Sequence, residues 1–179
     1  SYSHKLLSVK NSKTIMIIKT MYFMLPVLLL FVSVFLYRNN SRTMQKFYLR
    51  MTFSYHCRQL YSLVTLMVLI LFHYSAHEVM PTEYGIMIST VPMIILFRFK
   101  YADKILHLLH DKRKVAYCTA LATLVFLFIP HLYTLAATTA TILVAAGFYP
   151  SHHILHHSVN YENGIKLIEH PNTVVEYYY

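Results

Sequence analysis

Long runs without a charged residue dominate the pattern of apolar and polar positions along this chain. They cover residues 21–37, 60–76, 84–97 and 115–149. A helix needs about 20 apolar residues to cross the hydrocarbon core of a membrane, which is about 30 Å thick. The pattern therefore predicts helices that span a membrane.

The last of these runs is too long for a single crossing. Residues 115–149 would form a helix of about 52 Å, at about 1.5 Å per residue. We expect two short helices that meet at Pro130-His131, because proline interrupts the hydrogen bonding of a helix. The run 84–97 would reach only about 21 Å, so it either recruits flanking residues or forms a re-entrant or tilted segment.

The fold expected from these runs is an all-α membrane protein with about five short transmembrane helices; four is the alternative. The expected spans are residues 21–37, 60–76, 82–99, 115–130 and 132–149. Together they form a transmembrane domain over residues 21–149, which follows a basic N-terminal tail, residues 1–20.

Residues 150–179 are predicted to form a small extramembrane tail rich in His and Tyr. Asn163-Gly164 lies between two apolar stretches of this tail, a pattern that is typical of a β-hairpin turn. Residues 174–179 are interpreted as a further extended segment. Because so small a β-structure is not stable alone, the tail needs the membrane surface or another chain to pack on.

The composition agrees with a membrane protein. Hydrophobic residues make up 56% of the chain and charged residues 13%, with a mean hydropathy of +0.45. These values exclude an intrinsically disordered chain and a basic nucleic-acid-binding domain. Three glycines and two cysteines, Cys57 and Cys118, supply no glycine-rich phosphate loop, disulfide framework or Cys-based zinc module.

The charges indicate an orientation. Residues 38–59 carry five basic and no acidic residues, and residues 98–114 carry six basic and two acidic residues. Residues 75–83 carry two acidic and no basic residues. The positive-inside rule places the two basic segments on the cytoplasmic or mitochondrial matrix side and residues 75–83 on the other. If each successive span crosses the membrane, the basic N-terminal tail lies on the same side as residues 75–83, which is contrary to the positive-inside rule.

Residues 41–59 contain neither Gly nor Pro and are predicted to form a helix continuous with the second span. Its basic residues recur at steps of four or eight and form one stripe: Arg42, Lys46, Arg50 and Arg58. Apolar residues lie on its other side: Met44, Phe47, Tyr48, Met51 and Tyr55. Such a helix is suited to binding anionic phospholipid or a partner subunit; the alternative is an idle, solvated face. No nucleic-acid partner is expected, because no recognition motif accompanies the charge.

Histidine is the residue type that offers chemistry, with 12 in the chain. Four of them form the sequence HHILHH: His152, His153, His156 and His157. On a helix these give two pairs at a spacing of four, which is typical of metal-chelating histidines. They are the candidate ligands for iron or zinc.

Three histidine patterns resemble the boxes of the membrane fatty-acid desaturase and hydroxylase superfamily. His73 and His77 match HxxxH, His153, His156 and His157 match HxxHH, and His107 and His110 give HxxH without the doubled histidine. In that family the boxes bind two irons at the cytosolic membrane face, so the resemblance implies an iron-dependent enzyme acting on a lipid. The expected topology places the first pair on the opposite side of the membrane from the last pair, which argues against one shared site.

Other patterns of catalytic residues, such as GxSxG, a Walker loop or HExxH, do not occur. The expected spans also carry few of the ionisable residues that pumps and transporters place in the membrane. We therefore expect a non-catalytic accessory subunit, without a cofactor, in a multi-subunit membrane complex of an energy-transducing kind, such as a respiratory chain or ATP synthase. The expected partners are other membrane subunits and anionic phospholipid, in the mitochondrial inner membrane or a bacterial inner membrane. The alternatives are a histidine-box metal enzyme and a bacterial membrane sensor or anchor in signalling, secretion or defence machinery.

Overall fold

The computed structural model describes residues 16–178, apart from residues 18–19, 22–23, 25–26 and 38. The regular elements in this part of the chain are all helices, so the expected all-α fold is confirmed. After a short Val27–Leu36 helix come α2 (Arg42–Phe53), α3 (Tyr55–Val79), α4 (Gly85–Phe97), α5 (Phe99–Asp111), α6 (Arg113–Phe128), α7 (Tyr133–Gly147), α8 (His152–Val159), α9 (Tyr161–Glu169), the 3₁₀ helix η1 (Pro171–Thr173) and α10 (Val174–Tyr178). The expected N-terminal tail, residues 1–20, and the start of the first span fall largely outside the described residues.

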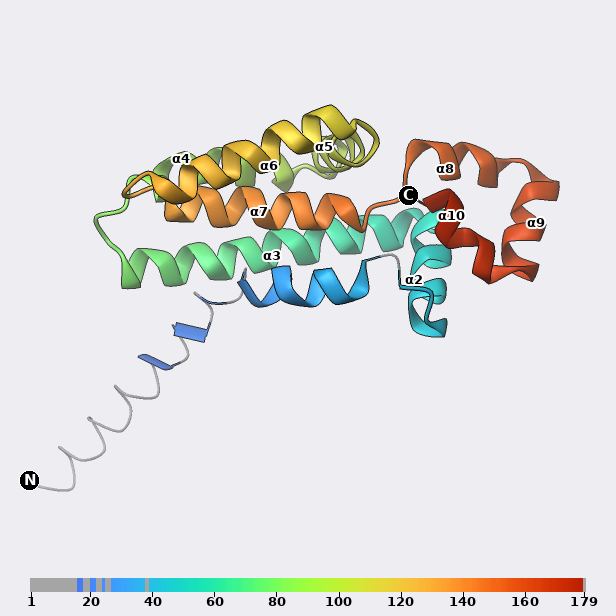
Figure 1. The fold of residues 1–179 in the computed structure, drawn as a ribbon, viewed down its shortest axis with the longest axis horizontal. Helices are drawn as coiled ribbons and strands as arrows, with labels where there is room; N and C mark the ends of the chain where they lie inside the picture. The colour runs from blue at the N-terminus through green and yellow to red at the C-terminus, as the bar shows by residue number, and fades with distance from the viewer. Residues whose placement is uncertain (1–15, 18–19, 22–23, 25–26, 38, 179) are drawn as a thin grey trace, which may run out of the picture.

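The helices form an elongated bundle with a cap at one end (Figure 1). The bundle consists of the Val27–Leu36 helix, α3, α4, α6 and α7, which lie side by side along the long axis. The cap consists of α2, α8, α9, η1 and α10. Helix α5 crosses the cap end of the bundle and joins α4 to α6.

Helix α7 forms the centre of the bundle, in contact with α3, α4, α5 and α6. Its alanines are buried along most of its length: Ala136, Ala137, Ala140, Ala145 and Ala146. Small side chains let neighbouring backbones approach closely. The hydroxyls of Thr123 of α6 and Thr139 of α7 also meet between the two helices, with their oxygens 3.0 Å apart.

A tight turn joins α6 to α7 at the end of the bundle opposite the cap. The break lies at Pro130-His131, where the sequence predicts it. His131 has a φ of 64°, in the left-handed region that non-glycine residues seldom adopt. Its carbonyl accepts a hydrogen bond of 2.9 Å from the N–H of Gly85, which joins the start of α4 to the start of α7.

The continuous helix predicted from residue 41 into the second span is wrong. The chain breaks at Ser54, whose φ of −109° and ψ of 113° are extended. The Ser54 hydroxyl accepts the N–H of Cys57 and so caps α3, while the Ser54 N–H bonds to Arg50 O at the end of α2. Serine competes with the helix for these backbone groups, and its side chain stabilises a new helix start.

The β-structure predicted in the tail is also wrong. Asn163 and Gly164 lie inside α9, and the segment expected to be extended forms η1 and α10. Gly164 and Leu167 are buried on one face of α9, while Val174 and Tyr178 are buried on one face of α10. Their spacing matches the period of a helix, and packing on the rest of the cap overrides the local turn preference of Asn-Gly.

Five separate crossings are not established by the helices themselves. Among the described residues, α3 is the one straight helix that is both long and apolar enough to cross a membrane. Helices α4 and α5 meet those criteria together, but they are bent by 106° at Arg98. The expected third span, residues 82–99, therefore corresponds to α4 alone, which is 13 residues long.

Candidate functional site

The basic stripe of α2 lies on the outer surface of the cap. Arg42, Lys46 and Arg50 are all exposed. Arg58 does not share this surface, because it belongs to α3 and turns back onto the end of α2. Its Nη1 donates hydrogen bonds of 3.0 and 3.1 Å to the carbonyls of Met51 and Thr52. The structure thus separates three candidate lipid-binding residues from a fourth that fixes the angle between α2 and α3.

The opposite face of α2 packs inside the cap. Met44, Tyr48 and Met51 are buried against α8, η1 and α10. The rings of Tyr48 and Tyr178 lie 4.4 Å apart between their centroids. This apolar face is therefore covered by the protein's own tail, and α2 presents only its charged face outward.

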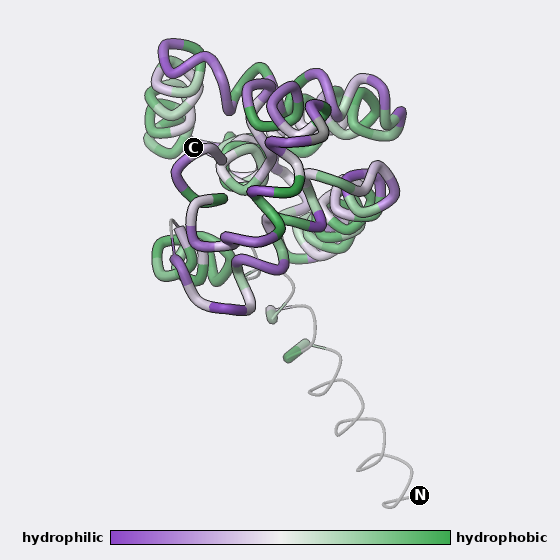
Figure 2. The backbone as a smooth tube through the Cα atoms, turned by 90° about the vertical axis from the view of Figure 1, so that its right-hand side faces the viewer, coloured by the Kyte–Doolittle hydropathy of each residue, from purple (hydrophilic) through white to green (hydrophobic). Residues whose placement is uncertain are grey.

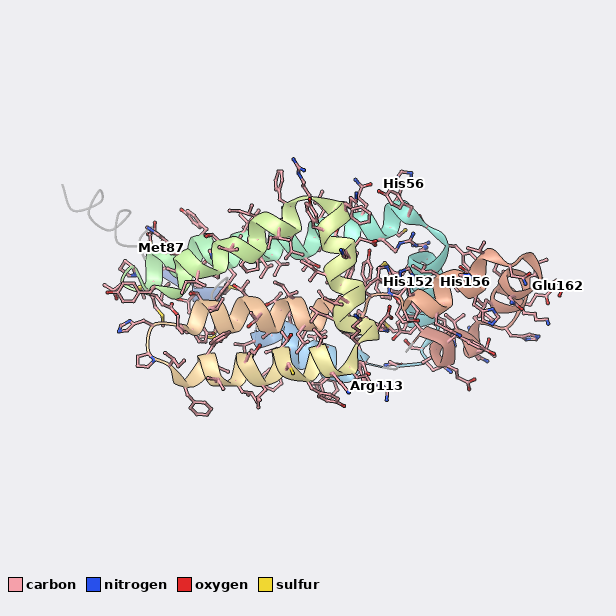
Figure 3. The ribbon with its side chains drawn as sticks, turned by 90° about the horizontal axis from the view of Figure 1, so that it is seen from above. His56, Met87, Arg113, His152, His156 and Glu162 are labelled. Carbon is pink, nitrogen blue, oxygen red and sulfur yellow. The ribbon has the colours of Figure 1, made fainter. Side chains whose placement is uncertain are left out.

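The four candidate metal ligands on α8 do not converge. His152 stacks on His107 of α5, with ring centroids 5.0 Å apart and planes 14° apart. His153 and His157 lie beside Tyr177 of α10, and His156 is exposed. Figure 3 labels His152 and His156, which lie one turn apart on α8. Over the described residues, no group of three or more His, Cys, Asp or Glu side chains is placed to hold a metal ion.

The histidine boxes lie at different places in the molecule. His73 is buried inside the bundle, where its Nε2 lies 2.7 Å from Ser89 Oγ and 3.3 Å from Ile86 O. His107 and His110 lie on α5 at the cap end. The structure brings the α5 and α8 histidines together through the stacked His107–His152 pair, and it leaves His73 far from both.

A polar cluster joins α5 to the end of α7 around Asp103 of α5. Tyr149 donates a hydrogen bond of 2.5 Å to Asp103 Oδ1, and His107 Nε2 lies 3.5 Å from the same oxygen. The His107 ring contacts the Tyr149 ring edge-on, with centroids 4.9 Å apart. Sequence spacing signals the Asp103–His107 pair, four residues apart on one helix, but nothing in the sequence links Tyr149 to them.

The electrostatics of this cluster favour an ionised Asp103. Burial opposes its ionisation, but hydrogen bonds with His107 and Tyr149, together with the charges of His107 and Arg58, outweigh burial and lower its pKa. Burial raises the pKa of Tyr149, and its hydrogen bond to Asp103 raises it further. The cluster is thus a phenol–carboxylate–imidazole network that holds α5 against the end of α7.

Replacing Asp103 with asparagine is expected to make the free energy of unfolding less dependent on pH under acidic conditions. A carboxylate whose folded-state pKa lies below its ordinary 3.8 stabilises the fold above that pH. This stabilisation is lost as the pH falls through the folded-state pKa. Thermal unfolding of Asp103→Asn between pH 3 and pH 7, followed by circular dichroism, measures the difference from the unmodified protein. The control is Asp111→Asn, which alters an exposed acid of the same helix. If the unfolding temperature falls equally with pH for Asp103→Asn and for the unmodified protein, this role of Asp103 is contradicted.

His110 connects three helix ends. From the last turn of α5, its Nδ1 lies 2.9 Å from Ala146 O near the end of α7, and its Nε2 lies 3.0 Å from Tyr178 O at the end of α10. It borders an open polar pocket of about 470 Å³ that also includes Asp111, Arg113 and His153. Carbonyls at the ends of helices carry partial negative charge, so a ring N–H bonded to either carbonyl stabilises the place where the ends of α7 and α10 meet α5.

Comparison with protein-family models, curated proteins and solved structures finds no match. The function of the chain is therefore argued from the geometry of its surfaces and its interior.

Proposed function

We propose that the bundle lies in a membrane, with the Val27–Leu36 helix region, α3, α4, α6 and α7 as its five crossings. The observation that carries this proposal is the outward exposure of large apolar side chains on all but the central helix. Examples are Val34, Phe35, Leu60, Leu63, Met87, Ile94, Leu121 and Phe128, each more than half exposed. Figure 2 shows hydrophilic residues gathered on the cap, which faces the viewer, and hydrophobic residues along the bundle helices behind it.

The interior of the bundle supports the same proposal. Thr134, Thr138 and Ser89 are fully buried, while leucines and phenylalanines point outward. Water-soluble proteins rarely expose contiguous apolar patches of more than a few hundred Å². Hydroxyl and small side chains at helix contacts are typical of bundles in lipid. The short helices fit a bilayer that thins locally, helped by flanking basic side chains that reach to its surface.

Charge gives the proposed orientation. The basic segments 38–59 and 98–114 both lie at the cap end, whereas Glu78 and Glu83 lie at the other end. The positive-inside rule then places the cap on the cytoplasmic or matrix side. Single-cysteine variants at Arg50 and Glu78, with Cys57 and Cys118 replaced by serine, test this arrangement. A membrane-impermeant maleimide is expected to label the two variants from opposite sides; labelling of both from one side would overturn it.

We further propose that the chain is a non-catalytic subunit of a larger membrane complex, of the energy-transducing kind. The polar clusters around α5 support this role, because Asp103, Tyr149, His107 and His110 interact with one another or with helix ends. Native mass measurement after mild detergent extraction, with identification of co-migrating chains, is the test. A particle of fixed composition is expected. A monodisperse particle containing this chain alone would overturn the role and leave the membrane assignment standing.

An apolar groove next to the basic stripe supports the binding of anionic phospholipid. The groove measures about 300 Å³ and lies between the Val27–Leu36 helix, α3 and α7. Leu29, Val32, Val64 and Val68 line it, and it reaches Phe47 of α2, which is adjacent to Lys46 in the chain. An acyl chain in the groove would therefore place its headgroup near the exposed basic side chains.

Removing the stripe is expected to weaken this lipid binding about a hundredfold. Each basic residue near an anionic surface contributes about 1 kcal/mol, so loss of three amounts to about 3 kcal/mol, or two powers of ten in affinity. The variant is Arg42→Gln with Lys46→Gln and Arg50→Gln, and native mass spectrometry counts the phosphatidylglycerol that it retains. Lys166→Gln, an exposed base on α9, is the control. Equal retention by the triple variant and this control would contradict the assignment.

A further inference from the structure

Several buried polar atoms inside the bundle have no hydrogen-bond partner. Among the described residues they are His73 Nδ1 of α3, Glu83 Oε2, and the hydroxyls of Thr134 and Thr138 of α7; a fifth, His107 Nδ1, lies at the cap end. The four residues in the bundle are each more than nine-tenths buried. Buried polar groups in folded proteins are nearly always paired, and unpaired ones commonly mark a bound water or ion.

These atoms line one seam between α3, α4 and α7. Glu83 Oε1 accepts the backbone N–H of Thr134 at 2.7 Å, so the carboxylate lies on the start of α7. Gly85 of α4 packs directly on the Thr134 side chain. Helices α4 and α7 start together and both run toward the cap. Ser89 follows Gly85 by four residues and Thr138 follows Thr134 by four, so both lie one helical turn further into the bundle. Ser89 Oγ is 2.7 Å from His73 Nε2, which brings α3 into the same seam.

The threonine hydroxyls of this seam differ from those elsewhere in the described chain. The other buried threonines, Thr52, Thr65, Thr123 and Thr141, each donate to the carbonyl four residues earlier. Thr138 makes no such bond, and Thr134 lies in the first turn of α7, where the carbonyl four residues earlier belongs to Pro130, outside the helix. A threonine in a helix readily bonds to its own backbone in this way. Two that do not are available to a ligand in the seam.

The hydrogen-bond inventory indicates which ligand fits. His73 Nε2 lies 2.7 Å from Ser89 Oγ and 3.3 Å from Ile86 O, and Ser89 Oγ lies 3.1 Å from the same carbonyl. Because a carbonyl only accepts, this arrangement fits a proton on Nε2 and none on Nδ1, although the ring also interacts with Leu69 O one turn earlier. Glu83 Oε2 is an acceptor without a donor. Water supplies donors to both and bonds to the two threonine hydroxyls, with the two to four partners that a buried water typically has.

We propose that ordered water fills this seam and links Glu83 to His73, forming a proton-binding site that is reached from the end of the bundle opposite the cap. A proton from the aqueous phase binds to the Glu83 carboxylate. It passes along the waters and the hydroxyls of Thr134 and Thr138 to His73 Nδ1, where the imidazole becomes a cation and Glu83 is again a carboxylate. No bond other than those to the moving protons forms or breaks. Ionisable side chains inside a membrane bundle are typical of proton relays.

In the part of the chain that the structure describes, few other titratable groups surround the site. Tyr133 of α7 is half-buried and feels the charge of Glu83, as does His73 itself. The remaining groups near this end are exposed: Tyr74, His77 and Glu78 of α3, and Tyr84 and His131 in the turns. The buried carboxylate and imidazole thus form a pair whose neighbours face outward, so a proton taken up at this end remains between them.

Infrared difference spectroscopy of the full chain in lipid nanodiscs tests this site. Lowering the pH is expected to produce imidazolium bands from His73 first and, at lower pH, a carboxylic-acid band from Glu83 when a second proton binds, together with water bands that shift on exchange into heavy-oxygen water. Glu83→Gln keeps an oxygen that can accept the Thr134 N–H and is expected to lose the carboxylic-acid band. Glu78→Gln, which alters an exposed carboxylate on α3, is expected to keep it.

A second variant keeps the test decisive if Glu83→Gln folds poorly. Thr138→Val preserves the shape of the side chain and removes one hydroxyl from the water chain. It is expected to shift the carboxylic-acid band and to remove one exchangeable water band. Spectra of Thr138→Val that match those of the unmodified protein, or water bands that are absent from the unmodified protein, would overturn the proposal. Both outcomes are independent of whether the chain is a subunit of a complex.

Discussion

Replacing Gly85 with alanine is expected to lower the free energy of unfolding by about 2 kcal/mol, as overpacking of a closed site typically does. A Cβ at this position would lie 2.5 Å from Thr134 Oγ1, and 3.1 Å from both His131 O and Leu132 Cα. The last two atoms belong to the backbone of the turn and cannot move without shifting α7. The usual gain from replacing glycine, about 0.4–1 kcal/mol, is smaller than this cost.

Gly147→Ala is the matched control, because a Cβ at that position meets nothing within 4 Å. Thermal unfolding in detergent micelles, followed by circular dichroism, is expected to show a Tm about 4–8 °C lower for Gly85→Ala. The control is expected to be as stable as the unmodified protein or more stable by up to about 1 kcal/mol. Adding Thr134→Ala to Gly85→Ala removes the shortest contact and is expected to restore part of the loss. A Gly85→Ala variant as stable as the control would show that α4 and α7 do not pack as closely as described.

Truncating Tyr178 is expected to have the largest effect of any single change in the tail, about 3–5 kcal/mol, the usual range for a buried aromatic residue replaced by alanine. Its side chain is fully buried and packs on Tyr48 of α2. Its hydroxyl donates to Phe148 O at 2.8 Å. Tyr178→Ala therefore removes the contact that holds α10 against both α2 and the end of the bundle.

The neighbouring residue provides the control. Tyr177 is 39% exposed, so Tyr177→Ala is expected to cost far less stability than Tyr178→Ala. Tyr178→Phe keeps the ring and loses one hydrogen bond, worth about 1 kcal/mol. Limited proteolysis gives a second measurement, since unpacking α10 is expected to expose residues 160–178 to cleavage. Equal proteolysis of the two alanine variants would show that Tyr178 does not anchor the cap.

The helical fold could be predicted from the sequence because uncharged runs and proline act on the local segment in which they occur. Proline removes a helix hydrogen bond, so the turn between α6 and α7 at Pro130 was predictable, although Pro92 is accommodated inside α4. The basic segments around Arg50 and Lys112 were expected on one side, and both lie at the cap end. The number of crossings was not settled by the same runs, because α4 is short and bends sharply into α5.

The errors arose where contacts distant in the chain decide the local structure. Asn163-Gly164 is a strong turn signal by itself, but Gly164 is buried inside α9, where a Cβ would lie 3.2 Å from Ser158 O and 3.7 Å from the Phe53 ring. The role of Glu83 was missed for the same reason, since the N–H that it accepts belongs to a residue 51 positions later. Ser54 differs, because its capping bond is local. The absence of Gly and Pro favoured a continuous helix there, and serine ended it.

The way the cap closes has a consequence for the order in which the protein is made. Gln45 of α2 donates a hydrogen bond to Asn172 of η1, 127 positions later in the chain. At about 5–20 residues per second of synthesis, that interval lasts roughly 6–25 s. During this interval the tail helices have not been synthesised, so the apolar face of α2 is uncovered. Its residues Met44, Tyr48 and Met51 are buried only in the finished protein. The ribosome-bound chain is therefore the form most exposed to aggregation, and a chaperone or lipid headgroups would protect it during synthesis.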